Sequence, residues 1–384
     1  MINSYSKETA MKINILLLAL AMSTCCNAYD SHIMQTNGLD KNISTPLFVD
    51  GITIPWAMVQ LPSDEILVSE REGELRVIKN GRLLPQHIIG LPKIHSNGQG
   101  GLLDLALHPD FEKNQWLYFT YASKEGKSSG SNTALMRATL NISKFSLTDK
   151  KLLYKAKPNS KKGRHYGSRI VFDDEGHVYF SVGDRGQRDV NPQDISKDGG
   201  KIYRLHDDGK IPSDNPFVDE SGAKSAIYSY GHRNPQGMSI DPLTKNIWSH
   251  EHGPRGGDEV NVIKKGANYG WPLVSYGINY NGTKLTDKTE MKGMEQPALY
   301  WTPSIAPSGM IYVSSDKYPS LKGKFLVGSM KFGHLVLLTI KGEQVVNQEK
   351  VFEDIGRARS LLQSKDGYIY VGVDGVGIKR LVPE

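Results

Sequence analysis

A chain of 384 residues, of which 38% are hydrophobic, is long enough for one large or two medium domains with a sizeable core. The formal net charge of +6 comes from 47 basic and 41 acidic residues that are scattered along the chain. Because no block of like charges is present, the composition argues against a nucleic-acid-binding arm.

The N-terminus has the pattern of an export signal. Lys12 is followed by an apolar run over residues 13–22 and then by small residues. This run is too short to span a bilayer. We therefore expect a signal peptide at residues 1–28, a periplasmic or secreted protein, and no integral membrane segment in the mature chain.

Cleavage after Ala28 would remove both cysteines of the chain, Cys25 and Cys26. Disulfides and cysteine-ligated metals are then excluded from the mature protein. The alternative is a lipoprotein that is acylated at Cys25 or Cys26.

After a linker expected at residues 29–45, residues 46–384 show short apolar or alternating runs separated by Gly, Asp, Asn and Pro, which favour strands and turns. Six copies of one pattern recur, each an apolar stretch, a turn and a second strand. We interpret them as an all-β, six-bladed β-propeller with long inserted loops, and a two-domain β-sandwich is the alternative. The repeats cover residues 56–70, 102–122, 168–184, 237–251, 309–329 and 359–374, and the loops lie around 185–230 and 255–300.

In a propeller, the residues just before each innermost strand meet at one end of the central channel. Read in this way, the repeats bring together mostly polar or cationic side chains, although each of them taken singly is more simply a loop residue. The set is Gln99, His165, Arg233, Asn234, Trp301, Arg357 and Arg359, with Lys331 joining from the turn after a neighbouring strand.

Four cations of this set, Arg233, Lys331, Arg357 and Arg359, would repel one another unless an anion lies among them. Guanidinium groups suit carboxylate or phosphate oxygens. Neither a GxGxxG turn that opens a helix nor a GxxxxGK[ST] loop is present. A carboxylated cofactor or an acidic sugar is therefore a better candidate ligand than a nucleotide.

The stretch HEHGPRGGDEVN, residues 250–261, combines histidines and carboxylates but lacks the helical spacing of zinc enzymes. Calcium binds carbonyl and carboxylate oxygens. We therefore predict that the carbonyl groups of Gly253 and Pro254 bind calcium, and that Asp258 and Glu259 supply charge to the same or a second ion. A solvated turn between strands is the alternative.

Six segments of the chain carry a family pattern: GQGGLLDLALHPDF (98–111), RHYGSRIVFDDEGHVYFSVGDRG (164–186), YGHRNPQGMSID (230–241), EHGPRGGDEVNVIKKGANYGWP (251–272), YWTPSIAPSGM (300–310) and GRARSLLQSKDGYIYV (356–371). They resemble the soluble pyrroloquinoline quinone (PQQ)-dependent glucose and aldose sugar dehydrogenases, and the aldose branch is the closer likeness. The resemblance implies a six-bladed propeller that binds PQQ and Ca²⁺ at the end of its channel and oxidises an aldose.

Carried over by motif, the resemblance implies that His165 is the general base for the anomeric hydroxyl and that Gly253 and Pro254 bind the catalytic Ca²⁺. Glu259, with the backbone of Tyr269, would bind a structural Ca²⁺. Trp301 would stack on the cofactor or the sugar, or else be a core residue. The residues expected to bind PQQ are Gln99, Arg233, Asn234, Tyr280, Lys331, Arg357 and Arg359.

This chain departs from the glucose dehydrogenase branch at Arg164, which precedes the expected base where that branch has an acidic residue. The adjacent residue therefore supplies no carboxylate to orient and tune His165, and a cation beside the imidazole is expected to lower its pKa. The electron acceptor is not specified by the sequence, and either a monomer or a homodimer is consistent with it. A lactonase-like hydrolase and a sugar-binding propeller module are the alternative functions.

Overall fold

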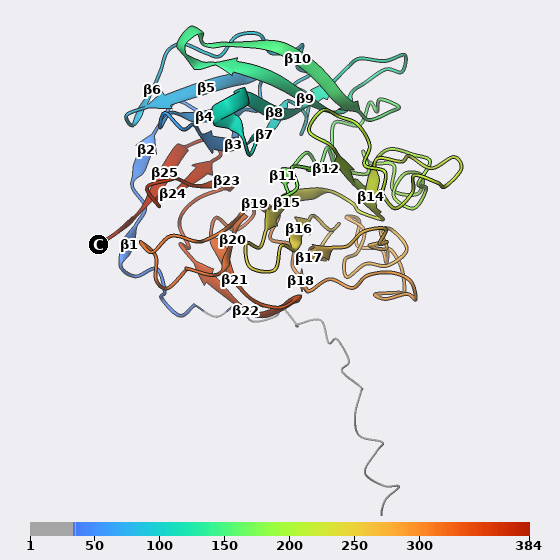
Figure 1. The fold of residues 1–384 in the computed structure, drawn as a ribbon. Helices are drawn as coiled ribbons and strands as arrows, with labels where there is room; N and C mark the ends of the chain where they lie inside the picture. The colour runs from blue at the N-terminus through green and yellow to red at the C-terminus, as the bar shows by residue number, and fades with distance from the viewer. Residues whose placement is uncertain (1–33, 35) are drawn as a thin grey trace, which may run out of the picture.

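The computed structural model describes residue 34 and residues 36–384, and six antiparallel sheets form a ring in this part of the chain (Figure 1). Within each sheet the strands follow chain order, and the first strands contact one another around the centre. The predicted all-β, six-bladed propeller is therefore confirmed, and the β-sandwich alternative is wrong. The expected signal peptide, with both cysteines, lies outside the described residues.

The first three blades contain the only α-helix and the only 3₁₀-helix found among the described residues, α1 (Phe111–Asn114) and η1 (Ile142–Lys144). Blade 1 consists of β3 (Pro55–Gln60), β4 (Ile66–Glu70), β5 (Glu74–Lys79) and β6 (Arg82–Leu83); blade 2 of β7 (Leu102–Leu107), β8 (Trp116–Ser123), β9 (Asn132–Asn141) and β10 (Ser146–Lys155); and blade 3 of β11 (Ile170–Phe172), β12 (Val178–Val182), β13 (Lys201–Leu205) and β14 (Ile227–Tyr230).

The remaining three blades follow the same order. Blade 4 consists of β15 (Pro235–Ile240), β16 (Ile247–Glu251), β17 (Asp258–Ile263) and β18 (Leu299–Trp301); blade 5 of β19 (Pro307–Tyr312), β20 (Phe325–Ser329), β21 (Leu335–Lys341) and β22 (Gln344–Val351); and blade 6 of β23 (Ala358–Gln363), β24 (Ile369–Val373) and β25 (Gly377–Pro383), joined by β1 (Ile43–Ser44) and β2 (Leu47–Val49).

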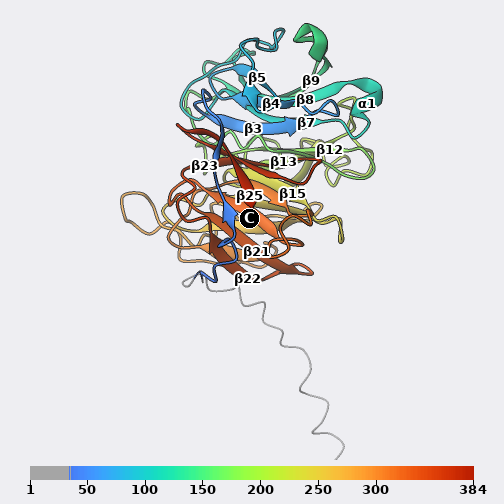
Figure 2. The ribbon, with the colours of Figure 1, turned by 90° about the vertical axis from the view of Figure 1, so that its left-hand side faces the viewer.

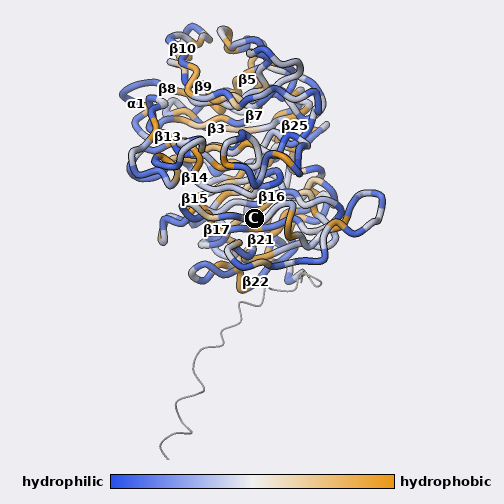
Figure 3. Tube along the Cα trace, turned by 90° about the vertical axis from the view of Figure 1, so that its right-hand side faces the viewer, coloured by the Kyte–Doolittle hydropathy of each residue, from blue (hydrophilic) through white to orange (hydrophobic). Residues whose placement is uncertain are grey.

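Each repeat found in the sequence corresponds to the first two strands of one blade. In five blades the second strand is buried at every residue, because neighbouring blades cover both of its faces. In Figure 3 the hydrophobic segments run along the strands, while many outer loops are hydrophilic. The expected loop regions 185–230 and 255–300 also contain strands, namely β13, β14, β17 and β18, which the repeat pattern did not reveal.

The ring is closed by the N-terminal segment, which lies beside the last strand of blade 6 (Figure 2). Ile43 pairs with Pro383, and Leu47 pairs with Lys379. The strand β1 lies within the stretch 29–45 that was expected to be a linker, so the sheet begins a few residues before position 46. Among the described residues, no helix has the length and apolar character needed to cross a membrane.

Five of the six seams between blades carry a hydroxyl group that donates to a backbone carbonyl of the next blade. At the fourth seam, between blades 4 and 5, the buried His250 lies at the corresponding position of β16. The five hydroxyl–carbonyl contacts fix the angle between neighbouring sheets at the ends of the innermost strands. The pairs are Ser69 to Leu103, Thr120 to Ser168, Ser181 to Pro235, Ser308 to Ala358 and Ser360 to Pro55, at 2.5–3.0 Å.

Candidate active site

The predicted site residues lie at one end of the ring, where the loops that precede the innermost strands meet. His165 precedes β11, Arg233 and Asn234 precede β15, and Arg357 precedes β23. Each innermost strand contacts those of both neighbouring blades, so their N-terminal ends surround the axis. The structure therefore brings these four residues to the same end of the propeller.

A carboxylate from the same blade holds the imidazole of His165. Nδ1 of His165 lies 2.7 Å from Oδ1 of Asp184, which follows β12. The backbone N–H of His165 donates to Oε1 of Gln99 at 2.7 Å, and the φ of His165 is 56°. A non-glycine residue in this left-handed region persists only where its surroundings define the backbone. Nε2 is the ring nitrogen that remains for a ligand.

Asp184 is fixed by further donors. Trp271 Nε1 donates to its Oδ2 at 3.0 Å, and the backbone N–H of Gly186 donates to its Oδ1 at 2.6 Å. Burial opposes ionisation of Asp184, but the hydrogen bond and charge of His165, the charge of Arg233 and the N–H of Gly186 together outweigh burial and lower the pKa of Asp184. Although Arg164 replaces the adjacent acid, His165 does have a carboxylate partner, because Asp184 comes from the end of the second strand.

The pKa of His165 is lowered by burial, with Arg233 and Arg164 acting in the same direction and Asp184 in the opposite one. The ring is therefore neutral near pH 7 and able to accept a proton. Gly183 packs against the backbone of His165: a Cβ at this position would be 2.3 Å from the carbonyl oxygen of His165, so only glycine allows this approach.

Arg233 and Asn234 are buried and only partly satisfied. Nη1 of Arg233 donates to the carbonyl of His252 at 2.8 Å, and Oδ1 of Asn234 accepts from the backbone N–H of Gly167 at 3.0 Å. In the part of the chain that the structure describes, Nε of Arg233 and Nδ2 of Asn234 have no hydrogen-bond partner. Because a buried donor without a partner is costly, these two groups are available to acceptor atoms of a ligand.

Two adjoining pockets open at this end, of about 240 and 740 Å³, and they share Pro254 and Tyr280. The smaller pocket is lined by His165, Asp184, Arg233 and Trp271, together with Lys162, Arg164, Gly186, Arg188, Asp189 and Asn279. The larger pocket is lined by His252, Gly253, Arg255, Gly256, Tyr276, Ile278, Thr302, Pro303, Ser304, Ala306 and Lys331.

Arg357 and Arg359 share one carboxylate, that of Asp374 after β24. Nε of Arg357 lies 3.1 Å from Oδ2 of Asp374, and Nη2 of Arg359 lies 2.6 Å from the same oxygen. Nη1 of Arg357 donates to the carbonyl of Met330, the neighbour of the exposed Lys331. Because Asp374 neutralises part of their charge, these arginines do not by themselves require an external anion, contrary to the repulsion argument.

The turn at Gly253 and Pro254 is tightly packed. The backbone N–H of Gly253 donates to Oδ1 of Asp258 at 2.8 Å, and a Cβ on Gly253 would lie 2.1 Å from the carbonyl oxygen of Gly257. Pro254 has no N–H, so carbonyl oxygens are the groups that this turn offers. Asp258 organises the turn, since it also accepts from Ser304, and burial raises its pKa to about 6.

Glu259 and Tyr269 belong to a second cluster behind the pockets. Glu259 is paired across the sheet with Glu251, and burial together with that carboxylate raises the pKa of Glu259. Glu251 accepts from Nδ1 of His232 at 2.9 Å, and the ring of His232 stacks on Tyr269 at 4.4 Å. The structure thus groups the two residues that the resemblance assigns to a structural Ca²⁺.

Two aromatic residues lie in different surroundings. Tyr280 lines both pockets, is 70% exposed, and its hydroxyl lies 3.5 Å from Nη2 of Arg233. Trp301 is 1% exposed in the hydrophobic core, and its Nε1 donates to Gln348 at 2.9 Å. Of the two roles considered for Trp301, the core role is therefore the correct one.

A carboxylate recurs at the end of the second strand in several blades, and the repeat pattern alone did not lead us to predict its role. In four blades an acid at the end of the second strand, Glu70, Asp184, Glu251 or Asp374, bonds to residues that precede or begin the innermost strand of the same blade. The signal was present, because four of the six repeats end in Asp or Glu. A comparison of repeat ends would have identified Asp184 as the partner of His165.

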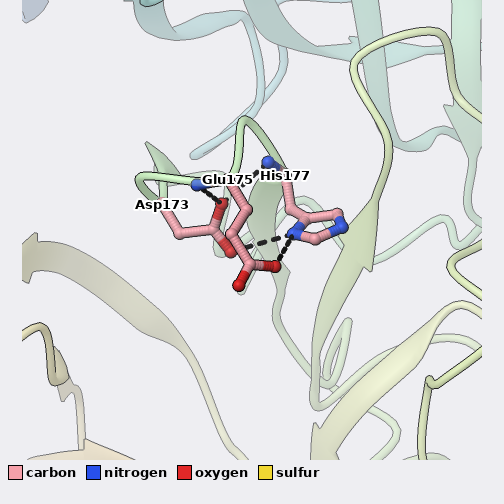
Figure 4. Close-up of side chains that lie close together, drawn as sticks. All are labelled: Asp173, Glu175 and His177. Atoms are coloured by element: carbon pink, nitrogen blue, oxygen red, sulfur yellow. Dashed lines mark hydrogen bonds and ion pairs between the residues drawn. The ribbon is translucent and has the colours of Figure 1, made fainter.

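The hairpin at the other end of β11 carries another group of potential metal ligands, Asp173, Glu175 and His177 (Figure 4). Asp173 accepts the backbone N–H groups of Glu175 at 3.0 Å and His177 at 2.8 Å, and its Oδ2 lies 3.0 Å from Nδ1 of His177. These bonds stabilise the turn between β11 and β12, which explains the cluster without a metal.

Comparison with known proteins agrees with this geometry. The sequence model of the family "Glucose / Sorbosone dehydrogenase" matches residues 52–380. Aldose sugar dehydrogenase YliI of Escherichia coli is 40% identical over 336 residues, which cover 86% of this chain and 90% of that protein.

Two solved structures share the fold. The soluble aldose sugar dehydrogenase of Escherichia coli in its apo form superposes with a TM-score of 0.86 and 37% identity over 89% of this chain and 100% of the other. The PQQ-bound aldose sugar dehydrogenase of Streptomyces coelicolor gives a TM-score of 0.72 and 26% identity, over 88% of this chain and 97% of that chain.

Proposed function

The chain belongs to the glucose/sorbosone dehydrogenase family, which confirms the resemblance, and from this premise we propose that it is a PQQ-dependent aldose sugar dehydrogenase that oxidises C1 of aldoses to lactones. The observation that carries the proposal is the His165–Asp184 pair, which lies in one pocket with the incompletely satisfied Arg233. A binding module would leave the His165–Asp184 pair without a role, and a lactonase-like hydrolase would leave the unpartnered donor of Arg233 unexplained.

The residues present fit a flat, carboxylated quinone. Nε of Arg233 and Nδ2 of Asn234 are buried donors that need acceptors, and Lys331 lines the adjoining pocket. Carboxylate and quinone oxygens are acceptors of this kind. In this proposal Arg233, Asn234 and Lys331 hold PQQ together with Gln99, Tyr280, Arg357 and Arg359.

The turn at Gly253 and Pro254 fits Ca²⁺, since its carbonyl oxygens are hard ligands. At the second cluster, burial and the neighbouring Glu251 carboxylate raise the pKa of Glu259. A structural Ca²⁺ bound by Glu259 and the backbone of Tyr269 would relieve this repulsion.

When bound, PQQ supplies the two-electron acceptor for the hydride that leaves C1 of the sugar, and Ca²⁺ supplies Lewis-acid polarisation. His165 takes the proton of the anomeric hydroxyl at Nε2. The hydrogen bond from Nδ1–H to Asp184 fixes the tautomer that leaves Nε2 unprotonated, and the carboxylate stabilises the imidazolium that forms. Loss of the O–H proton and the C1–H hydride leaves the lactone carbonyl.

The test is reconstitution of the purified protein with PQQ and Ca²⁺, followed by dye reduction with a panel of aldoses. We expect aldose-dependent turnover only in the presence of PQQ. Turnover that is equal without PQQ, or lactone hydrolysis without PQQ, would refute the dehydrogenase proposal and favour the hydrolase.

The proposal places the protein in the periplasm or outside the cell, after cleavage of residues 1–28. Its support is the export pattern of the N-terminus. Mass spectrometry of the mature N-terminus tests it: a chain that begins at residue 29 is expected, and a diacylglyceryl cysteine at Cys25 or Cys26 would establish the lipoprotein alternative.

A further inference from the structure

The smaller pocket contains three cations that are not assigned to the proposed cofactor, namely Lys162, Arg164 and Arg188. Its lining includes four cations, Lys162, Arg164, Arg188 and Arg233, against two carboxylates, Asp184 and Asp189. With His165 neutral, the lining has a net charge of +2. The other cations assigned to PQQ, Lys331, Arg357 and Arg359, do not line this pocket.

We call Lys162, Arg164 and Arg188 the rim of the smaller pocket, and these three cations differ in their bonding partners. Nζ of Lys162 donates to the carbonyl of Gly186 at 2.5 Å, a bond that leaves its charge in place. Arg188 donates from Nη1 to Oδ1 of Asn279 at 2.8 Å and lies 3.4 Å from Asp189.

Arg164 is exposed, and its guanidinium has no hydrogen-bond or ion-pair partner among residues 36–384. Arg164 lines the same pocket as His165, and its Nε lies close to Gly186, where a Cβ would be 2.8 Å from it. Guanidinium forks bind carboxylate and phosphate groups through paired hydrogen bonds.

Resting on the proposed function, we propose that the preferred substrates are aldoses that carry an anionic group, as uronic acids and aldose phosphates do, and that Arg164 pairs with that group. Lys162 and Arg188 add attraction from two sides of the rim. The oxidation at C1 is unchanged, because the anionic group is distant from the anomeric carbon and takes no part in the reaction.

The test compares kcat/KM for glucose, glucose 6-phosphate and glucuronate in the reconstituted enzyme, with an uncharged electron acceptor. The anionic sugars are expected to be preferred, and Arg164→Gln is expected to reduce the anionic-to-neutral ratio about tenfold, as for loss of a charged hydrogen bond. Any change in the pKa of His165 affects all three sugars alike and cancels in the ratio. Lys161→Gln, the same loss of charge at an exposed residue outside the pocket lining, is the matched control.

An unchanged anionic-to-neutral ratio in Arg164→Gln would overturn the inference. If glucose and its phosphate then lose rate equally, and the loss disappears when the electron acceptor is changed, these cations bind the electron acceptor instead. If no sugar supports PQQ-dependent turnover, the proposed function fails, and calorimetric titration of the protein with glucose 6-phosphate and glucose still decides whether Arg164 binds the anion.

Discussion

Blade 3 carries an aspartate–histidine pair at each end, and the two pairs differ in the segments that supply them and in their surroundings. His165 and Asp184 are 2.7 Å apart and come from two loops, while His177 and Asp173 are 3.0 Å apart within one turn, residues 173–177. The first pair lies in a pocket lined by Arg233, whereas the second satisfies the backbone of its own hairpin. A histidine–carboxylate bond alone is therefore no evidence for catalysis.

The largest expected effect distinguishes the two histidines. His165→Ala removes the proposed base and should lower PQQ-dependent turnover by about 10²–10⁴-fold, the usual contribution of general-base catalysis. PQQ binding, followed by absorbance titration, should be largely retained. His177→Ala is the matched control and should leave turnover unchanged; equal losses in both variants would remove His165 from the role of base.

Asp184→Asn should have a smaller effect, about 10- to 100-fold on kcat, equivalent to a charged hydrogen bond of about 1.5–3 kcal/mol. The carboxylate raises the pKa of His165 against the effect of burial, so its loss should lower that pKa further. The acidic limb of the kcat/KM profile should therefore move to lower pH.

Asp173→Asn, at the other pair, should change neither the rate nor the pH profile. An acidic limb that stays in place in Asp184→Asn would mean that the limb does not report His165.

Arg359→Ala should weaken PQQ binding by about tenfold, since it removes a charged donor, and should leave Asp374 paired with Arg357 alone. This loss of affinity is measured by titrating PQQ into the protein and recording the activity at each PQQ concentration. Arg82→Ala, at an exposed arginine of blade 1, is the control. Equal PQQ affinity in the two variants would show that Arg359 serves only to hold Asp374.

The smallest expected effect concerns the scaffold on which the first pair rests. Ser181→Ala removes the 3.0 Å bond to the carbonyl of Pro235 and should lower the free energy of unfolding by about 1 kcal/mol. Denaturant unfolding measures this, with the exposed Ser129→Ala as control. A loss no greater than in Ser129→Ala would show that this seam contact does not stabilise the ring.

The repeats predicted the fold because the first two strands of each blade carry the same buried pattern, which alternation and turns reveal in sequence. The outer strands β13, β14, β17 and β18 were not predicted, since long loops separate them from this pattern. The closing strand β1 was missed because its two residues pair with β25 at the other end of the chain.

The site was predictable where one segment carries it, as with His165, and not where distant segments meet. Trp271 donates to Asp184 from 87 positions away, and Arg188 reaches Asn279 across 91 positions. Neither contact has a local pattern. The acids at the ends of the repeats did have a local pattern, and comparing the repeat ends would have identified Asp184 and Asp374.

The most direct test is a crystal structure of the protein grown with PQQ and Ca²⁺. Our account predicts PQQ in contact with Arg233 and Asn234 in the pocket that contains His165, with Nε2 of His165 left open for the sugar and a Ca²⁺ ion on the carbonyl oxygens of Gly253 and Pro254. Cofactor density at any other place, or a cation beside Asp173 and His177 while the His165 pocket contains only water, would contradict it.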